Sequence, residues 1–348
     1  MTEELELEST LYQRARKHRD QFPGGDGDHY AGRYKALKTT FQNDYQQYVD
    51  AALALGEGML FTSHGVNHFR TVIQRASRIV KFDLTSLNGY ELYLLLISIH
   101  LHDIGNLFGR RRHEKECKRI IDELGSLLTD NSFEKRLFYE IASAHGGTIG
   151  LNKDTIRPLK SVTTFLGQTI HERKLAAILR LADELADDFT RVSAALLKLG
   201  IANSVYHYYA KGLQTVEIRP EQARVELHFS FERSVLVKQL PKDAGRKVWL
   251  LDELLTRCLK TFSEMRYASQ YMRTINFDEL HVNVEWAQGG FHVPLKTVSF
   301  TFDSLGFPSV TEADIYELIP SLKKYGDIGK LTGKNLCNHI IGKRRGKK

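Results

Sequence analysis

The stretch SIHLHDIGN, residues 98–106, decides the fold of this chain. It closes an apolar run that begins at Glu91 and places a histidine–aspartate doublet, His102-Asp103, near the end of a predicted helix. A buried, ionised aspartate costs free energy unless it is paired or binds a cation. The doublet therefore predicts that other helices bring partners to it.

Histidines gather around the doublet. The chain has 14 histidines, and these fall within one window of about eighty residues: His64, His68, His100, His102, His113 and His145. Two of them, His64 and His68, are four residues apart, so on a helix they share one face. Imidazole and carboxylate groups on successive apolar helices are what a transition-metal site requires. The pattern indicates a metal-dependent hydrolase.

Asp183 also lies among apolar residues, in ILRLADEL. Burying its charge would therefore cost free energy, as it would for Asp103. A divalent ion held by His68, His102, Asp103 and Asp183 would satisfy both carboxylates. It would also leave coordination positions open for water and substrate.

Each of these residues also has a simpler interpretation. A single histidine on a helix is usually a core or surface residue, and Asp183 alone could pair with Arg180 one turn before it. Asp103 alone could cap the turn at Gly105. The adjacent doublet, with flanking histidines on separate helices, favours the metal site over these separate explanations.

The composition is that of a globular protein with a large core: 348 residues, 42% hydrophobic and 26% charged. The longest apolar run, LYLLLISIHLH, is too short and too rich in histidine to span a bilayer. The N-terminus, MTEELELEST, lacks the basic start and apolar middle of a signal peptide. The three cysteines, Cys117, Cys258 and Cys337, show no paired spacing, which fits a reducing compartment. We expect a cytoplasmic protein without a membrane partner.

The net charge of +7 and the pI near 9.1 favour anionic partners. Part of that charge lies in the C-terminal GKRRGKK, which is more often a solvated end than a binding site. We expect a nucleotide or another phosphoester as substrate, with nucleic acid as an alternative partner. The sequence does not predict the oligomeric state.

Two regions follow one another along the chain. Residues 1–200 predict a helical domain, of which 1–55 are a helical extension with a turn at FPGGDGDHY. Residues 201–348 predict a smaller α+β accessory domain with a basic tail: strands in VYHYYAKG, QTVEIRP, ARVELHFSFE, ELHVNVEW and LKTVSFTFD, and a helix over about 246–273. The predicted fold class is α+β, a mainly helical bundle followed by this smaller part.

The residues of the predicted site resemble the HD superfamily of metal-dependent phosphohydrolases. The pattern of that superfamily is a histidine, a His-Asp doublet and a distant aspartate on a helical bundle. This chain supplies His68 in NHFRTV, His102-Asp103 in HLHDIGN and Asp183 in LRLADELADD. The resemblance covers about residues 55–195, and LADEL looks like the branch associated with bacterial conflict and defence. It implies an HD-type bundle in which His102 and Asp103 are catalytic.

Some HD proteins hold two metal ions, and the resemblance extends to this second ion. His113, in GRRRHEKE, and His145, in IASAHGG, occupy the matching places. In that interpretation Asp103 bridges the two ions, and His64 binds the second ion or the phosphate. His113 could instead be a surface histidine in a charged segment.

One position departs from the pattern. Many HD phosphodiesterases carry a lysine shortly after the doublet, and this chain has Asn106 there. Phosphate binding would then fall to Arg110, Arg111 and Arg112, whose planar guanidinium groups match phosphate oxygens. The alternative is that these arginines form a solvated face.

The resemblance implies hydrolysis of a phosphoester by water that a divalent metal activates. Manganese, iron, nickel, cobalt or zinc, as one ion or two, suits the histidine-rich ligands, whereas a binuclear site disfavours magnesium, which prefers oxygen ligands. The first hypothesis is a nucleotide phosphohydrolase or phosphodiesterase. The alternatives are a nuclease on single-stranded DNA or RNA, and a ligand-sensing HD module without turnover.

Overall fold

The computed structural model describes residues 5–57, 62–149, 152–287, 298–303 and 314–345. The chain forms two compact units. The first unit comprises residues 1–58, 63–186 and 267–276, and the second comprises 59–62, 187–266 and 277–348. The sequence placed its division near residue 200, and the accessory role of the later part stays a prediction.

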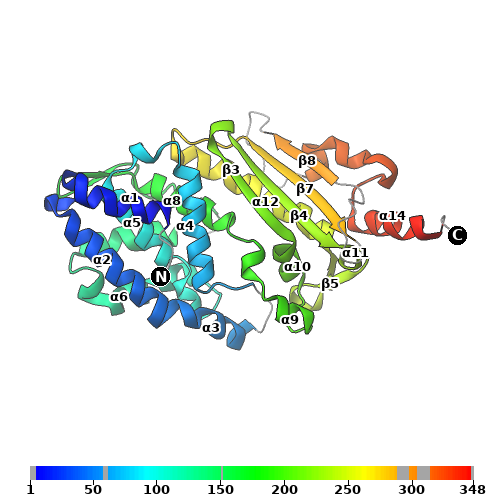
Figure 1. The fold of residues 1–348 in the computed structure, drawn as a ribbon, viewed down its shortest axis with the longest axis horizontal. Helices are drawn as coiled ribbons and strands as arrows, with labels where there is room; N and C mark the ends of the chain where they lie inside the picture. The colour runs from blue at the N-terminus through cyan, green and yellow to red at the C-terminus, as the bar shows by residue number, and fades with distance from the viewer. Residues whose placement is uncertain (1–4, 58–61, 150–151, 288–297, 304–313, 346–348) are drawn as a thin grey trace. The chain divides into compact units, whose positions relative to one another are not determined.

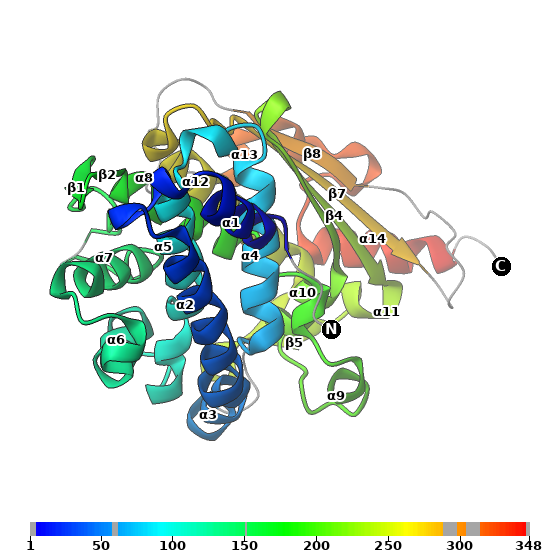
Figure 2. The same cartoon turned by 60° about the vertical axis from the view of Figure 1, so that its left-hand side comes forward.

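The first unit is a helical bundle, which can be followed in Figures 1 and 2. Its main helices are α1 (Glu6–Lys17), α2 (Gly27–Thr40), α3 (Gln47–Glu57), α4 (Val66–Val80), α5 (Gly89–Leu101), α6 (His113–Leu128), α7 (Ser132–Ser143) and α8 (Glu172–Glu184). A π-helical segment, η3 (Phe41–Gln46), joins α2 to α3. A short antiparallel hairpin, β1 (Thr163–Phe165) with β2 (Gln168–Ile170), precedes α8.

Helix α5 is the centre of the bundle. All of its residues are buried, and it packs against α1, α2, α7 and α8. Its start is fixed by a capping box, in which Asn88 Oδ1 accepts from the amide of Glu91 at 2.8 Å and Glu91 Oε2 accepts from the amide of Asn88 at 2.9 Å. A helix that is apolar on every side needs this surrounding layer, because no side of it can face water.

Helix α5 ends at Leu101, and the chain continues through the doublet into a 3₁₀ segment, η5 (Ile104–Phe108). The glycine of this turn allows α6 to approach closely. A Cβ at Gly105 would overlap the carbonyl oxygen of His113, which is backbone and has no room to move aside. The doublet therefore lies where the central helix turns toward the start of α6.

The second unit contains a four-stranded mixed sheet of order β3-β4-β7-β8. Its strands are β3 (Leu213–Arg219), β4 (Arg224–Glu232), β7 (Glu279–Ala287) and β8 (Val298–Asp303), in which β4 and β7 are parallel and the outer pairs antiparallel. Alternate residues of β4 and β7 are buried, so one face of the sheet forms a core. The other helices and strands of this unit are α9 (Ala194–Lys198), α10 (Val205–Gly212), α11 (Arg233–Leu236), β5 (Gln239–Pro241), β6 (Lys247–Trp249), α13 (Ile315–Leu318) and α14 (Gly333–Arg345). The long helix α12 (Leu250–Met272) begins in this unit, and its residues from Tyr267 on belong to the first unit.

The predicted fold class, a helical bundle with a smaller α+β part, is confirmed. One predicted strand is wrong: VYHYYAKG forms the helix α10. Its aromatic content favoured a strand, but Val205, Tyr209 and Gly212 are buried at the four- and three-residue spacing of a helix face. The ring of Tyr209 lies 5.2 Å from that of Phe229 on β4, so packing on the sheet overrides the local preference.

Within the described residues, no helix taken singly has the length and apolar character needed to cross a membrane. One pair of helical segments, Gly89–Phe108 and His113–Leu128, passes the length and composition test when combined, and the two are bent by 105°.

Gly212 provides a test of how α10 packs on the sheet. A Cβ there would overlap the ring of Phe231, a buried residue of β4, so we expect Gly212→Ala to lower the free energy of unfolding by about 1–3 kcal/mol. Both tryptophans of the chain, Trp249 and Trp286, lie in the second unit, so fluorescence in a urea titration follows its unfolding.

The matched control is Gly342→Ala on α14, where a Cβ would meet nothing within 4 Å. We expect a change within about 1 kcal/mol, toward higher stability, because alanine is the better helix former. Equal effects of the two substitutions would contradict the packing of α10 against Phe231.

Candidate metal centre

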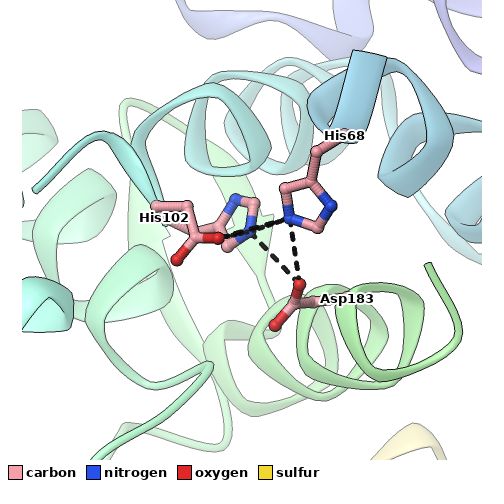
Figure 3. Close-up of side chains that lie close together, drawn as sticks. His68, His102 and Asp183 are labelled. Carbon is pink, nitrogen blue, oxygen red and sulfur yellow. Dashed lines mark hydrogen bonds and ion pairs between the residues drawn. The ribbon is translucent and has the colours of Figure 1, made fainter. Parts of the chain in front are cut away.

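Two helices, α4 and α8, and the turn after α5 bring four ligand groups to one point. His68 lies in the first turn of α4, His102 and Asp103 directly follow α5, and Asp183 lies near the end of α8. His68 Nε2 is 3.2 Å from Asp183 Oδ1, 3.3 Å from Asp103 Oδ2 and 3.3 Å from His102 Nε2. Figure 3 shows the side chains of His68, His102 and Asp183 directed toward one another. All four donor atoms lie within 4.8 Å of one another.

A second group shares Asp103. Its other oxygen, Oδ1, is 2.9 Å from His113 Nε2 and 3.7 Å from His145 Nε2, and these two nitrogens are 3.4 Å apart. His113 is the first residue of α6, and His145 lies two residues after the end of α7. The carboxylate of Asp103 thus faces one cluster with each oxygen.

Burial and charge act in opposite directions on the two aspartates. Burial alone raises the pKa of Asp103, but His102 and then His113, His145 and His68 lower that pKa well below its usual value. Burial likewise raises the pKa of Asp183, but His102 and His68 lower it by more, so the pKa lies well below its usual value. Both groups are therefore carboxylates, the form in which aspartate binds a cation.

The imidazoles are oriented by the backbone. The Nδ1 atoms of His102, His113 and His145 lie 2.7, 3.0 and 2.6 Å from the carbonyl oxygens of the residues three positions earlier. A carbonyl only accepts, so each Nδ1 carries a proton and donates it. In the neutral ring the Nε2 lone pair is then directed into the clusters, as in metal sites whose ligand imidazoles donate to the backbone.

The comparison with protein families gives a match over more than half of the chain. A family model described as HD-CE matches residues 46–257. The chain belongs to the HD-CE family. No curated protein matches it. The predicted membership of the HD superfamily is confirmed, and an HD-type domain with a buried His/Asp cluster supports a metal-dependent HD hydrolase in general.

The donor atoms of the HD-CE chain fit a divalent ion. Ligands about 2.0–2.2 Å from a metal, at tetrahedral to octahedral angles, lie roughly 3.0–3.5 Å apart. The separations around His68 Nε2, 3.2 and 3.3 Å, fall in this range. In the neutral ring, the Nε2 lone pair of His102 would be directed toward His68 and the two carboxylates, and a cation between them removes the repulsion of that lone pair by the carboxylates. His68, His102, Asp103 and Asp183 would hold one ion, and Asp103, His113 and His145 a second.

Two further residues predicted for the site lie at its edge. His64 Nε2 is 3.8 Å from Asp103 Oδ2. Arg110 Nη1 is 3.8 Å from Asp103 Oδ1 and 3.5 Å from His113 Nε2. Both are therefore within reach of a group bound at the two clusters.

Arg110 lies at the site, whereas the two arginines that follow it do not. Arg111 and Arg112 are exposed in the turn before α6, and Arg112 has a left-handed backbone with φ 59°. Neither makes an ion pair with any residue that the structure describes. Of the three predicted phosphate-binding arginines, the structure brings Arg110 to the cluster.

Asn106 is buried and connects two parts of the site. Its Nδ2 donates to the carbonyl of Asp103 at 2.9 Å, and its Oδ1 accepts from Arg110 at 3.2 Å. His100 lies elsewhere, with its ring stacked on Phe41 at a centroid distance of 5.4 Å, and burial lowers its pKa to about 3. The imidazole of His100 is thus neutral near pH 7.

Asp50, on α3, contacts the segment that carries His64, and no pattern in the sequence points to it. Asp50 Oδ1 accepts from the amide of His64 at 2.6 Å, and Oδ2 accepts from Ser63 at 2.5 Å. An aspartate in QYVDAAL has no motif around it, so the sequence alone gave no signal for this contact.

Asp103 belongs to both clusters, so its charge is decisive for binding. We expect Asp103→Asn to lose nearly all bound metal, because the amide is a neutral and weaker ligand. Elemental analysis of the purified chain, reported as ions per chain, measures this. Asp122→Asn on the exposed side of α6 is the matched control and keeps the wild-type content. Equal metal content in the two variants would contradict the site.

Proposed function

We propose that the protein hydrolyses a phosphoester bond of a nucleotide, as a metal-dependent phosphohydrolase or phosphodiesterase. The observation that carries the proposal is the position of Asp103, one oxygen of which faces His68 and the other His113. Two adjacent cation sites that share a carboxylate suit a phosphoester, whose attacking and leaving oxygens both need charge stabilisation.

A divalent ion bound there supplies Lewis acidity, which brings the pKa of water toward neutrality and withdraws charge from the phosphoryl group. The chain itself supplies the ligands and the orientation. Asp103 and Asp183 bring negative charge, and the imidazoles bring neutral nitrogen donors. The hydrogen bonds from Nδ1 to backbone carbonyls keep His102, His113 and His145 aligned without further reorganisation.

The substrate approaches from the side on which the ligands are partly exposed. The side chain of Asp183 is 25% exposed and that of His113 is 12%, whereas His68 and His102 are fully buried. Arg110 is 36% exposed, and its Nη1 lies 3.5 Å from His113 Nε2. Its guanidinium group would bind a phosphoryl oxygen and offset charge as the ester bond breaks. His64, next to Asp103, would serve either as a metal ligand or as a second hydrogen-bond donor to the phosphate.

A nucleotide is the substrate class favoured by the net charge of +7. Two of the three tyrosines of VYHYYAKG do not favour a nuclease, because Tyr209 is buried and Tyr206 donates to Asp243 at 3.0 Å. A base-stacking platform needs exposed rings. A role in bacterial defence, drawn from LADEL, stays a prediction.

The test is hydrolysis by the purified full chain with added manganese or nickel, on bis-p-nitrophenyl phosphate and a panel of nucleotides. We expect turnover that a chelator abolishes and added manganese restores. His102→Ala should reduce the rate to that of the buffer, while His29→Ala on the exposed face of α2 keeps the wild-type rate. Equal rates in wild type and His102→Ala would refute the assignment.

The same assay separates the substrate classes. A single-stranded oligonucleotide cleaved while every nucleotide is left intact would favour a nuclease. No turnover by a metal-loaded chain would favour a ligand-sensing module. Arg110→Ala should lower kcat/KM about 10- to 100-fold through loss of a charge-assisted hydrogen bond, with Arg111→Ala as the matched variant of little effect.

A further inference from the structure

The segment before α4 is held by a carboxylate from α3. The two oxygens of Asp50 accept from the amide of His64 and the hydroxyl of Ser63, at 2.6 and 2.5 Å. The amide of Gly65 donates in turn to Ser63 Oγ at 3.3 Å. Ser63 and His64 are thus tied directly to Asp50 and Gly65 is tied to it through Ser63, and α4 begins at the next residue, Val66.

Gly65 shows how closely this segment lies against α3. A Cβ on Gly65 would be 2.9 Å from Asp50 Oδ2 and 3.6 Å from the carbonyl oxygen of Gln46. Gln46 and Asp50 are four residues apart and meet the same segment from the same side. The His64–His68 part of the site therefore rests on one turn of the η3–α3 helix.

Gln46 holds the other part of the site. Its Nε2 donates to the carbonyl oxygen of His100 at 3.3 Å and lies 3.0 Å from His100 Nδ1. His100 lies in the last turn of α5, where carbonyl groups lack a partner within the helix. Gln46 thus caps the helix end from which His102 and Asp103 project.

The hydrogen bonds around His100 have one consistent direction. The hydroxyl of Tyr34 donates to Glu8 at 2.6 Å, so it can only accept from His100 Nε2, which is 3.3 Å away. His100 Nδ1 then carries the lone pair and accepts from Gln46. Both amide hydrogens of Gln46 are used, which fixes its orientation. Gln46 closes the π-helical segment Phe41–Gln46, a type of helix that is rare and frequent at functional sites.

From these contacts we propose that Gln46 and Asp50 are positioning residues that set the separation between the His64–His68 segment and the His102-Asp103 doublet. The inference rests on the proposed metal-dependent function, because that separation places His68 Nε2 3.3 Å from Asp103 Oδ2 and from His102 Nε2. Neither residue belongs to either ligand cluster. Each acts through the backbone that carries a ligand, as the outer partners of metal ligands do.

The test for Asp50 compares three variants of the full chain. Asp50→Ala removes both acceptors, and we expect manganese affinity, measured by titration calorimetry or by electron paramagnetic resonance, to fall about 10- to 100-fold. Asp50→Asn still accepts from the amide of His64 and donates to Ser63 Oγ, so it should restore most of that affinity. Asp44→Ala, an exposed aspartate of η3, should leave it unchanged.

The test for Gln46 uses Gln46→Met, which keeps the shape of the side chain and removes its hydrogen-bond donors. We expect a similar loss of manganese affinity and a lower kcat, with KM less affected. Gln47→Met, on the exposed neighbour, is the matched control. Wild-type manganese affinity in both Gln46→Met and Asp50→Ala would overturn the proposal, whatever their thermal stability.

Amide hydrogen exchange in the metal-free protein separates this proposal from the proposed function. We expect Asp50→Ala to speed exchange at the amide of His64, while Asp44→Ala does not. Unchanged exchange at His64 would overturn the positioning role even if hydrolysis is demonstrated. A wild-type chain that binds no manganese would refute the proposed function, and the exchange result would then decide whether Asp50 holds the segment.

Discussion

The structure depends on two carboxylates that are enclosed by imidazoles. Asp103 is almost fully buried, and Asp183 on α8 contacts two of the histidines that surround it, His68 and His102. Burying such charges is unfavourable unless partners compensate for it. In the first unit, the compensation comes from nitrogen donors on α4, α6 and the segments that follow α5 and α7. The helix contacts that pack the bundle therefore also bring the residues of the site together.

The central helix makes this convergence possible. Because α5 is apolar on all sides, it is surrounded by α1, α2, α7 and α8, and its end is fixed deep in the bundle. The turn at Gly105 then brings His113 within 2.9 Å of Asp103. A second layer holds these elements: the carbonyl acceptors behind the histidine rings, Asn106 behind Asp103, and Gln46 and Asp50 on the helix before α4. Through Gln46 and Asp50, the helical segment η3–α3 near the start of the chain supports the residues of the site.

Two parts of this arrangement can be predicted from the sequence: those that follow from helical periodicity, and those that follow from the free-energy cost of burying a charge. The long apolar helices repeat at helical spacing, and an aspartate among apolar residues demands partners, so the bundle and the grouping of His68, His102, Asp103 and Asp183 could be anticipated. The helix α10 could not be anticipated, because its tyrosines and valine also fit a strand pattern. Its packing on β4 determines that the segment is a helix. Gln46 and Asp50 carry no motif, and their contacts join segments 54 and 14 residues apart. Arg110 and Arg111 are identical in type, and the turn geometry alone distinguishes them.

The most direct measurement is a crystal structure of the manganese-soaked protein with anomalous scattering data collected for manganese. We predict a strong anomalous peak about 2.0–2.3 Å from His68 Nε2, His102 Nε2, Asp103 Oδ2 and Asp183 Oδ1. An anomalous map without a peak at that point, or with manganese bound only at other residues, would contradict it.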